Sequence, residues 1–249
     1  MRASTYAVEA AIEETHWWFV GRRHLFRREL TRAGAAPDSR TLDVGTSTGS
    51  NLRLLRDLGY SRVTGLDVNL DAIRFCESKG FGTVQQGSIC AIPFPDESFD
   101  VVLATDVIEH VDDDGLALAE ISRVLAPAGR VLVTVPAFQS LWGLQDEVAH
   151  HKRRYRVRPL LDLVRRAGLQ PRRVFHFNYL LFAPIWLARG VMRMARIDLR
   201  SEAEVNTPAL NALLRAIFAV DLWTAPVVRP PFGVSILILA EKPHVRNRR

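Results

Sequence analysis

Cysteine is scarce in this chain: 249 residues contain two, Cys76 and Cys90. Two cysteines build neither a disulfide framework nor a zinc cluster of cysteines, and such sparse use suits a reducing compartment. Compositional bias is lacking too, with 15 glycines, 13 prolines, 48% hydrophobic and 24% charged residues. Disordered, collagen-like and low-complexity classes are therefore excluded. The length suffices for one full α/β domain with a sizeable core, or for two small domains.

Long apolar runs are missing as well. The longest uncharged apolar stretch, residues 174–188, has 15 residues and contains a histidine, an asparagine and a proline. A membrane-spanning helix needs about 20 apolar residues. Near the N-terminus, Glu9 and Glu13 interrupt the only place where the apolar part of a signal peptide would fit. We therefore expect no transmembrane segment and a cytoplasmic protein. The net charge of +6 favours an anionic surface as partner without identifying it.

From residue 40 onward, short β-branched runs alternate with helical stretches. Strands are expected over 40–44, 62–66, 83–85, 99–104, 131–135, 170–177 and 233–240, and helices over 51–58, 70–79, 114–125 and 159–167. Most of the strand runs are apolar throughout, as in strands buried on both faces. The pattern predicts right-handed βαβ units and a doubly wound, mostly parallel α/β sheet. About fifty residues rich in helix signals separate the last two strands, with Thr207 as an N-cap before Pro208.

The turn after the first strand decides which nucleotide-like ligand the sheet takes. It has glycine at 45 and 49. A dinucleotide fingerprint needs glycine at 45, 47 and 50, so that the backbone and helix dipole approach a pyrophosphate. Positions 47 and 50 are serine. A nicotinamide or flavin dinucleotide is therefore disfavoured.

The pattern acidic-x-Gly-x-small-x-Gly from Asp43 to Gly49 resembles the first motif of class I S-adenosylmethionine-dependent methyltransferases. Three later segments, 93–102, 106–111 and 123–130, are similar to further motifs of that family in order and spacing. The resemblance is strong over residues 40–137. It implies a Rossmann-like fold with seven strands, the last antiparallel, a helical insertion before it, and S-adenosylmethionine as cofactor.

The resemblance also implies the cofactor-binding residues. Asp67, at the end of the second strand, would accept hydrogen bonds from both ribose hydroxyls. Arg22 or Arg23 in the Trp-Trp-Phe arm of residues 14–23, which looks like the opening arm of a bacterial subgroup, would pair with the methionine carboxylate. The alternative is that the arm's tryptophans pack on the sheet edge beside solvated arginines. The implied set is Asp43, Gly45, Thr46, Ser47, Gly49, Asp67, Val68, Ser88, Ile89, Thr105, Asp106 and Arg22.

Two positions depart from the family pattern: Ser47 replaces the middle glycine, and Ser88 replaces an aspartate near the adenine. If position 47 needs a left-handed backbone, serine costs about 1–2 kcal/mol. If its φ is negative, serine is harmless and its hydroxyl is free to contact the ligand.

Methyl transfer from a sulfonium requires alignment, and an oxygen acceptor also needs a base. His110, after the fourth strand, and His151, after the fifth, are the candidates, each with a structural alternative. We expect no metal, because adjacent histidines point apart and no carboxylate or cysteine has ligand spacing. The basic side chains after His151 would bind a phosphate or sulfate on the substrate, or form a solvated loop; they are Lys152, Arg153, Arg154, Arg156 and Arg158.

The insertion bears on the acceptor. Arg189, Arg193, Arg196 and Arg200 form a stripe beside an apolar face, as in helices that lie on a membrane surface. Alternatively, the insertion helices cap the acceptor pocket or form a dimer interface; the oligomeric state is not predicted. A nucleic-acid acceptor is disfavoured, because no Asx-Pro-Pro-aromatic string follows the fourth strand.

We thus predict a methyltransferase acting on a small molecule, through oxygen, with an amphiphilic or lipid-linked acceptor and peripheral contact with the inner membrane. The alternatives are a catalytically silent cofactor-binding scaffold, a nucleic-acid methyltransferase and a dinucleotide reductase. A single domain is expected over 1–249, comprising a helical arm (1–30), a cofactor-binding core (38–178), a helical insertion or lid (180–231), a final strand (232–241) and a basic tail (242–249).

Overall fold

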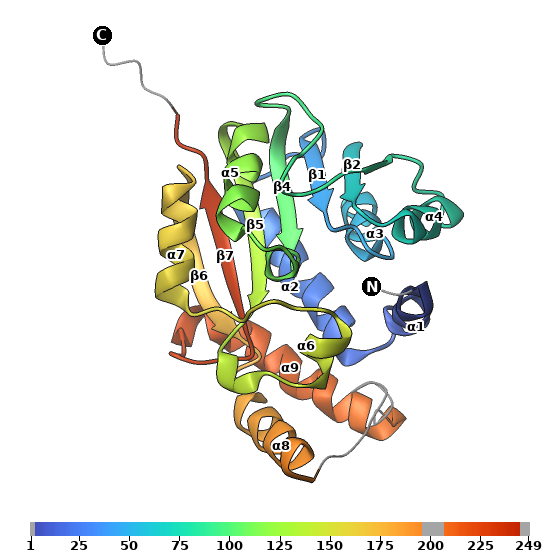
Figure 1. Ribbon diagram of the computed structural model, residues 1–249, viewed down its shortest axis with the longest axis vertical. Coiled ribbons are helices and arrows are strands. Elements are labelled where there is room, and N and C mark those ends of the chain that lie inside the picture. Colours follow the sequence, from blue (N-terminus) through green and yellow to red (C-terminus); the bar gives the residue numbers. More distant parts are fainter. Residues whose placement is uncertain (1–2, 196–206, 245–249) are drawn as a thin grey trace.

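A seven-stranded sheet forms the centre of the protein in a computed structural model, which describes residues 3–195 and 207–244 (Figure 1). The strands are β1 (Arg40–Val44), β2 (Arg62–Asp67), β3 (Val84–Gln86), β4 (Phe99–Thr105), β5 (Leu125–Pro136), β6 (Gln170–Phe177) and β7 (Ser235–Glu241). Their order is β3-β2-β1-β4-β5-β7-β6, and β7 runs antiparallel to both of its neighbours. The predicted doubly wound, mostly parallel fold with an antiparallel last strand is confirmed.

Helices cover both faces of this sheet (Figure 1). One face carries α5 (Asp114–Val124) and α7 (Val157–Arg166), and the other carries α2 (Trp17–Ala33), α3 (Ser50–Asp57) and α9 (Pro208–Val228), with α4 (Leu70–Ser78) near β3. The carboxyl ends of the parallel strands face α1 (Ala3–Ile12), α6 (Leu144–Val148) and α8 (Phe182–Ala195). The site described below therefore lies where loops and short helices meet this edge.

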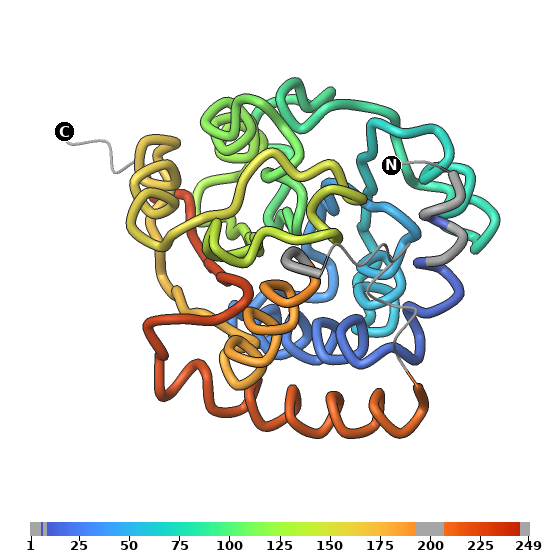
Figure 2. Tube along the Cα trace, turned by 60° about the horizontal axis from the view of Figure 1, so that its bottom comes forward, coloured from blue at the N-terminus to red at the C-terminus, as the bar shows by residue number. Residues whose placement is uncertain are grey.

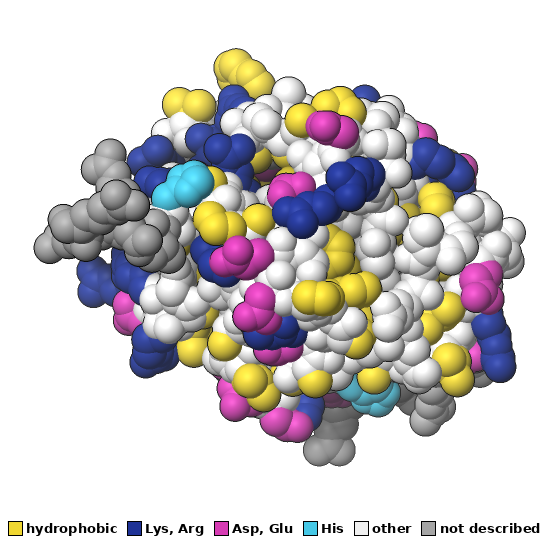
Figure 3. All heavy atoms as spheres, turned by 90° about the horizontal axis from the view of Figure 1, so that it is seen from above, with side chains coloured by type: hydrophobic (Ala, Val, Ile, Leu, Met, Phe, Trp, Pro, Cys, Tyr) yellow, Lys and Arg dark blue, Asp and Glu magenta, His cyan; other side chains and the backbone are white. Residues whose placement is uncertain are grey.

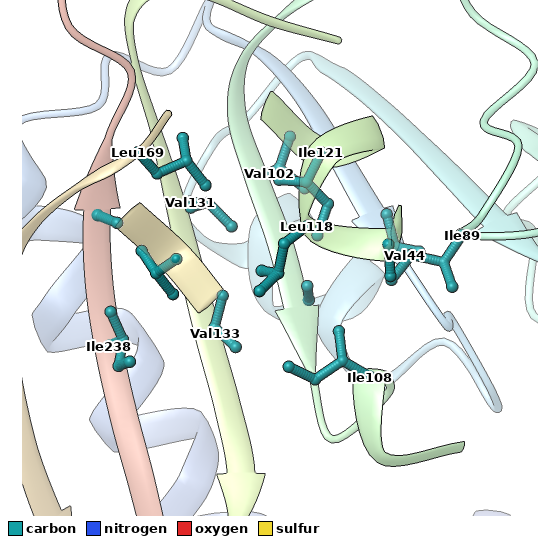
Figure 4. Packing of buried hydrophobic residues seen from close by; sticks show 14 of the residues in the cluster. Val44, Ile89, Val102, Ile108, Leu118, Ile121, Val131, Val133, Leu169 and Ile238 are labelled. Atoms are coloured by element: carbon teal, nitrogen blue, oxygen red, sulfur yellow. The ribbon is translucent and has the colours of Figure 1, made fainter. Parts of the chain in front are cut away.

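The apolar strand runs explain why the sheet is buried on both sides. Leu118 and Ile121 of α5 pack against Val102 and Val131 of the central strands (Figure 4). On the opposite face, a second cluster contains Phe26, Phe177 and Phe218, from α2, β6 and α9. Each fully buried side chain of this size contributes about 1.5–3 kcal/mol relative to leaving it exposed.

Strand β5 begins six residues earlier than predicted, at Leu125 instead of residue 131. Leu125 pairs with Phe99, and regular pairing with β4 resumes at Arg130 after an irregularity. Ala128 inside this irregularity has φ +61° and donates its N–H to the carbonyl oxygen of Lys242 at 2.9 Å. The Ala-Pro-Ala-Gly composition of residues 126–129 is typical of a turn. Hydrogen bonding to the segment after β7 nevertheless makes these residues part of the strand.

The described part of the insertion contains two helices, α8 and α9. The predicted N-cap is confirmed, since the Thr207 hydroxyl oxygen accepts from the Leu210 N–H at 3.3 Å. By length and composition alone α9 could span a membrane, although no transmembrane segment is expected from the sequence. In this fold α9 lies beside α2 (Figure 2), with its Asp221 carboxylate accepting the backbone N–H groups of residues 178 and 180. The sites of Arg196, Arg200 and the last five tail residues, and the Arg193 side chain, lie outside the described part.

Candidate functional site

The glycine turn after β1 is held in left-handed backbone. Gly45 and Gly49 have φ +74° and +85°, and a Cβ at Gly45 would stand 2.7 Å from the Val107 side chain, so this position needs glycine. Ser47 has φ +49°. Of the two alternatives for this serine, the left-handed one is observed, with its cost of about 1–2 kcal/mol.

Asp67 ties this turn to the end of β2. Its Oδ2 accepts the Ser47 backbone N–H at 2.9 Å, and its Oδ1 accepts that of Asn69 at 2.9 Å. The side chain is buried, while the next residue, Val68, is 68% exposed. Each carboxylate oxygen still has acceptor capacity, because it carries two lone pairs. The arrangement suits a ligand with vicinal hydroxyls lying over the turn.

Asp43 and Thr46 lie beneath the turn. Asp43 is fully buried and accepts the side-chain N–H of Asn51 at 2.9 Å, and the same amide group donates to the Thr105 hydroxyl. The Thr46 hydroxyl donates to the backbone carbonyl oxygens of Asp43 and Leu66. These two predicted cofactor residues therefore support the turn from below.

Burial raises the pKa of Asp43 to about 7. A carboxyl group whose folded-state pKa is raised binds its proton more tightly when folded, so its favourable effect on stability is lost as the pH rises from about 4 to about 7. Three pH units correspond to about 4 kcal/mol. We expect Asp43→Asn to remove this decline. Urea unfolding of both proteins between pH 4.5 and 7.5 measures the difference in slope, and parallel curves would contradict the expectation.

The N-terminal arm lies over the glycine turn. The carboxylate of Glu9 on α1 accepts from the Ser47 hydroxyl at 3.0 Å, and that of Glu13, just after α1, accepts from Thr48 and from the Lys79 ammonium group. Buried Tyr6 packs its ring near Phe75 of α4. The cofactor position expected from the sequence is thus covered by carboxylates and an aromatic ring of the arm.

The aromatic part of the arm has a packing role. The rings of Trp17 and Trp18 lie 5.2 and 5.4 Å from that of Phe218 on α9, as in the alternative considered for them. Arg22, in contrast, is not solvated: its guanidinium group pairs with the Asp106 carboxylate at 2.5 Å, and its side chain is 16% exposed. The arm therefore brings a cation to the carboxyl end of β4.

After β3, Ile89 is buried in the main core and the Ser88 hydroxyl accepts the Cys90 N–H. After β4, Thr105 is buried and Asp106 has φ +52°. Most of the predicted cofactor residues thus gather around the ends of β1, β2 and β4, although several use their polar atoms within the protein.

His110 and His151, predicted from separate loops, lie together. Their rings are 4.7 Å apart between centroids and nearly perpendicular. Burial first, and the neighbouring His151 second, lower the pKa of His110 to about 4. His151 Nδ1 lies 2.8 Å from Oδ1 of Asp146 and its Nε2 lies 3.9 Å from Oε1 of Glu109. Burial raises the pKa of Glu109 well above its usual range.

Sequence reasoning missed Asp146 as a functional residue. Its carboxylate is fully buried and accepts the N–H of Gly143 and of Arg154 Nε, both at 2.8 Å, besides facing His151. These hydrogen bonds, led by that of His151, hold its pKa at about 2 although burial alone would raise it. Since Asp146 is ionised, His151 donates from Nδ1, and a neutral ring keeps its lone pair on Nε2. Asp146 could be predicted as the partner of His151 only if the conformation of the loop between them were known.

The prediction for Arg189 needs correction, and the structure bears on the alternatives left open for the basic loop. Arg189 is 7% exposed, donates to the Leu141 carbonyl oxygen and lies 3.6 Å from Asp146, so it is not part of an arginine stripe that faces a membrane surface. In the basic loop, Lys152, Arg153 and Arg154 pair with Asp112, Asp114 and Asp146. Those three charges are compensated within the protein rather than held free for a substrate phosphate.

Hollows elsewhere do not compete with this site. One of about 130 Å³ lies at the amino-end edge of the sheet, near Gly34 and Arg130, and one of about 200 Å³ lies near Arg56 and Gly80. The amino-end edge mixes basic, acidic and apolar side chains (Figure 3). The concentration of buried polar groups is at the opposite edge.

Comparison with known proteins gives a consistent result. A family model described as a methyltransferase domain matches residues 42–133. A probable S-adenosylmethionine-dependent methyltransferase of Mycolicibacterium smegmatis is 29% identical over 163 residues, covering 64% of this chain and 62% of that protein. A ubiquinone/menaquinone biosynthesis C-methyltransferase of Bdellovibrio bacteriovorus is 29% identical over 141 residues, covering 51% of this chain and 60% of that protein. The chain thus spans about 60% of the length of these relatives.

Among solved structures, one chain of a methyltransferase complex from Haloferax volcanii, which contains the Trm112 activator, has the same fold. Its TM-score is 0.65 at 20% identity, and the match covers 97% of both chains.

Proposed function

Because the chain carries a class I S-adenosylmethionine-dependent methyltransferase domain, whose cofactor is S-adenosylmethionine, we propose that it methylates a hydroxyl oxygen of a small-molecule acceptor. The observation that carries the proposal is the pairing of two features at one sheet edge: the Asp67 carboxylate over the glycine turn and the His110–His151 pair beyond β4 and β5. When bound, the cofactor supplies a methyl group activated on a sulfonium sulfur.

The residues at the turn fit this cofactor. Asp67 has acceptor capacity for two ribose hydroxyls, and Gly45 keeps the left-handed turn closely packed against Val107. No phosphate has to be held, which agrees with serine at 47 and 50. Arg22 and Asp106, paired at the end of β4, would hold the charged methionine end. Val68, Ser88 and Ile89 would line the nucleoside side.

The catalytic residues we propose are His151 and His110. Hydroxyl oxygen is a poor nucleophile until it loses its proton, and positioned groups that assist this loss contribute about 10²–10⁴-fold in rate. Asp146 fixes the ring of His151 so that its Nε2 faces the Glu109 carboxyl group. A neutral imidazole offers one lone pair, which can accept a proton or a cation.

Label transfer from S-adenosylmethionine to a metabolite extract tests this function. We expect the parent protein to label a hydroxyl compound, and His151→Asn to reduce turnover at least about 100-fold while cofactor binding stays unchanged. His150→Asn is the matched control, because His150 is exposed and has φ +57°, which asparagine tolerates. Binding of the cofactor without labelling would indicate a silent protein, and calorimetric binding of a dinucleotide instead would indicate a reductase.

We further propose that the acceptor is amphiphilic and that the cytoplasmic protein meets it at an anionic membrane surface. Support comes from the outward face of α9, where Leu213, Val220, Trp223 and Val227 are 54–82% exposed, with Arg215 on the same helix. An exposed apolar helix face suits the headgroup region of a bilayer, and a cation elsewhere on the same helix adds attraction to anionic lipids. Beside the site, the Phe138 and Phe232 rings both contact Phe182, which provides an apolar wall for an acceptor.

Co-sedimentation with phosphatidylglycerol vesicles at low salt tests the membrane contact. Combining Val220→Ser with Trp223→Ser should weaken binding at least about tenfold, since each buried side chain of this kind contributes about 1.5–3 kcal/mol. Leu116→Ser, at a 45% exposed position on α5, serves as the control. Equal sedimentation of all three proteins would contradict the proposal. So would a dimer, detected by light scattering, that buries the apolar face of α9 between its two chains.

A further inference from the structure

Among the described residues, the buried carboxyl group of Glu109 beside the two candidate histidines makes no side-chain hydrogen bond. Glu109 is fully buried, and within residues 3–195 and 207–244 neither of its carboxylate oxygens accepts a hydrogen bond. Ionising a buried carboxyl group that accepts no hydrogen bond is costly, and a bound cation would compensate that charge. The group faces the imidazoles: one donor atom each of Glu109, His110 and His151 lie within 4.8 Å of one another.

The backbone fixes this cluster. A single 3-10 turn, residues 108–110, presents Glu109 and His110 as sequence neighbours. The Lys152 N–H donates to the Glu109 carbonyl oxygen at 2.8 Å, and the His151 N–H donates to that of Asp146 at 2.8 Å. The first bond holds the loop after β5 against the turn after β4, and the second fixes the loop itself. Glu109 and Lys152 are 43 positions apart in the sequence, so sequence inspection does not reveal this arrangement.

We propose that Glu109, His110 and His151 bind a first-row divalent transition-metal cation, which activates the acceptor hydroxyl of the proposed methyl transfer. The inference rests on that proposed function for the cation's role. Two imidazoles and one carboxylate suit zinc, manganese, iron or cobalt, whereas magnesium and calcium prefer oxygen ligands throughout. The expectation of no metal rested on the spacing of residues in the sequence. The folded loops nevertheless bring Glu109 close to the two histidines.

The geometry is close to that of a bound site. Ligand atoms at about 2.0–2.2 Å from a cation lie about 3–4 Å from one another. The 3.9 Å between His151 Nε2 and Glu109 Oε1 falls in this range, so small side-chain rotations complete the site. The Asp146 contact to Nδ1 of His151 adds the carboxylate–histidine arrangement that orients imidazole ligands in metal sites.

Three protein ligands leave coordination positions open for an oxygen of the acceptor. A cation lowers the pKa of a hydroxyl that it binds, and the proton leaves to solvent water. His151 then serves as a ligand, with its lone pair on the cation.

The experiment uses the full chain, stripped with a chelator and titrated separately with zinc, manganese and cobalt chlorides in a calorimeter, without cofactor or acceptor. We expect one equivalent per chain for at least one cation, and a Co²⁺ absorption spectrum that reports histidine ligation. Glu109→Gln and His151→Asn should each weaken binding at least about 100-fold, and His150→Asn should leave it unchanged. The thermal midpoint of each variant shows whether it is folded, and that of the parent should rise with bound cation.

Stoichiometric binding that depends on Glu109 and His151 supports the proposal. Absence of stoichiometric binding for all three cations, or equal binding by the parent and the Glu109→Gln protein, overturns it. Cofactor binding is measured separately in the same samples. Failure of the parent to bind S-adenosylmethionine would sink the proposed function, whatever the cation result, so the two failures are distinguishable.

Discussion

Replacing Asp67 by alanine should weaken S-adenosylmethionine binding at least about 100-fold. The substitution removes the hydrogen bonds proposed to the ribose, and hydrogen bonds to a charged group contribute about 1.5–3 kcal/mol each. It also removes the two contacts that hold the backbone N–H groups of Ser47 and Asn69. Isothermal calorimetry with the purified chain measures the change.

Asp71→Ala provides the control for this experiment. Asp71 lies four residues away in the first turn of α4, and its carboxylate is half-exposed beside Arg74. Its removal should change cofactor affinity by less than about threefold. Asp67→Asn separates charge from shape, since it keeps the size of the side chain. Should Asp67→Ala bind the cofactor as tightly as the parent, the pocket lies elsewhere.

Replacing Asp146 by alanine should lower the free energy of unfolding by about 3–5 kcal/mol, the usual loss when one partner of a buried ion pair is removed. The side chains of Arg154 and Arg189 are 4% and 8% exposed, so both charges would stay buried near an empty space. The Gly143 N–H would also lose its acceptor. Urea denaturation monitored by circular dichroism measures the change.

Asp162→Ala is the matched control for stability. Asp162 also pairs with an arginine, three residues along α7, but both side chains are about 60% exposed. Exposed pairs contribute about 0–1 kcal/mol, so this substitution should change stability little. A loss below 1 kcal/mol in the Asp146→Ala protein would show that the buried network is not needed for folding.

The fold was largely predictable because apolar runs and glycine stops repeat along the chain. Five of the strands follow the expected bounds within one residue, and β7 begins two residues late. The start of β5 was missed because residues 126–129 have the composition of a turn, and only pairing with β4 and the segment after β7 makes them part of the strand. Local composition does not contain that information.

The cofactor turn was predictable from its motif, but the group beyond it was not. Glu109 and Asp146 became candidates only in three dimensions, because a 3-10 turn and two backbone hydrogen bonds bring them to His151. Arg189 was misassigned for a related reason. Helical spacing identifies residues that share a face, but it does not say whether that face meets water or another segment. Here Gly143 provides the space, since a Cβ there would lie 3.0 Å from the Arg189 side chain.

Arg189 and His151 face opposite oxygens of one carboxylate, although the insertion and the loop after β5 are far apart along the chain. The orientation of the His151 ring is therefore coupled, through Asp146, to the position of α8. A molecule that displaces α8 would move the Arg189 guanidinium group away from Asp146. The carboxylate would then keep its contacts with Gly143, His151 and Arg154. Binding of a bulky substrate against α8 would then also change the orientation of the His151 ring.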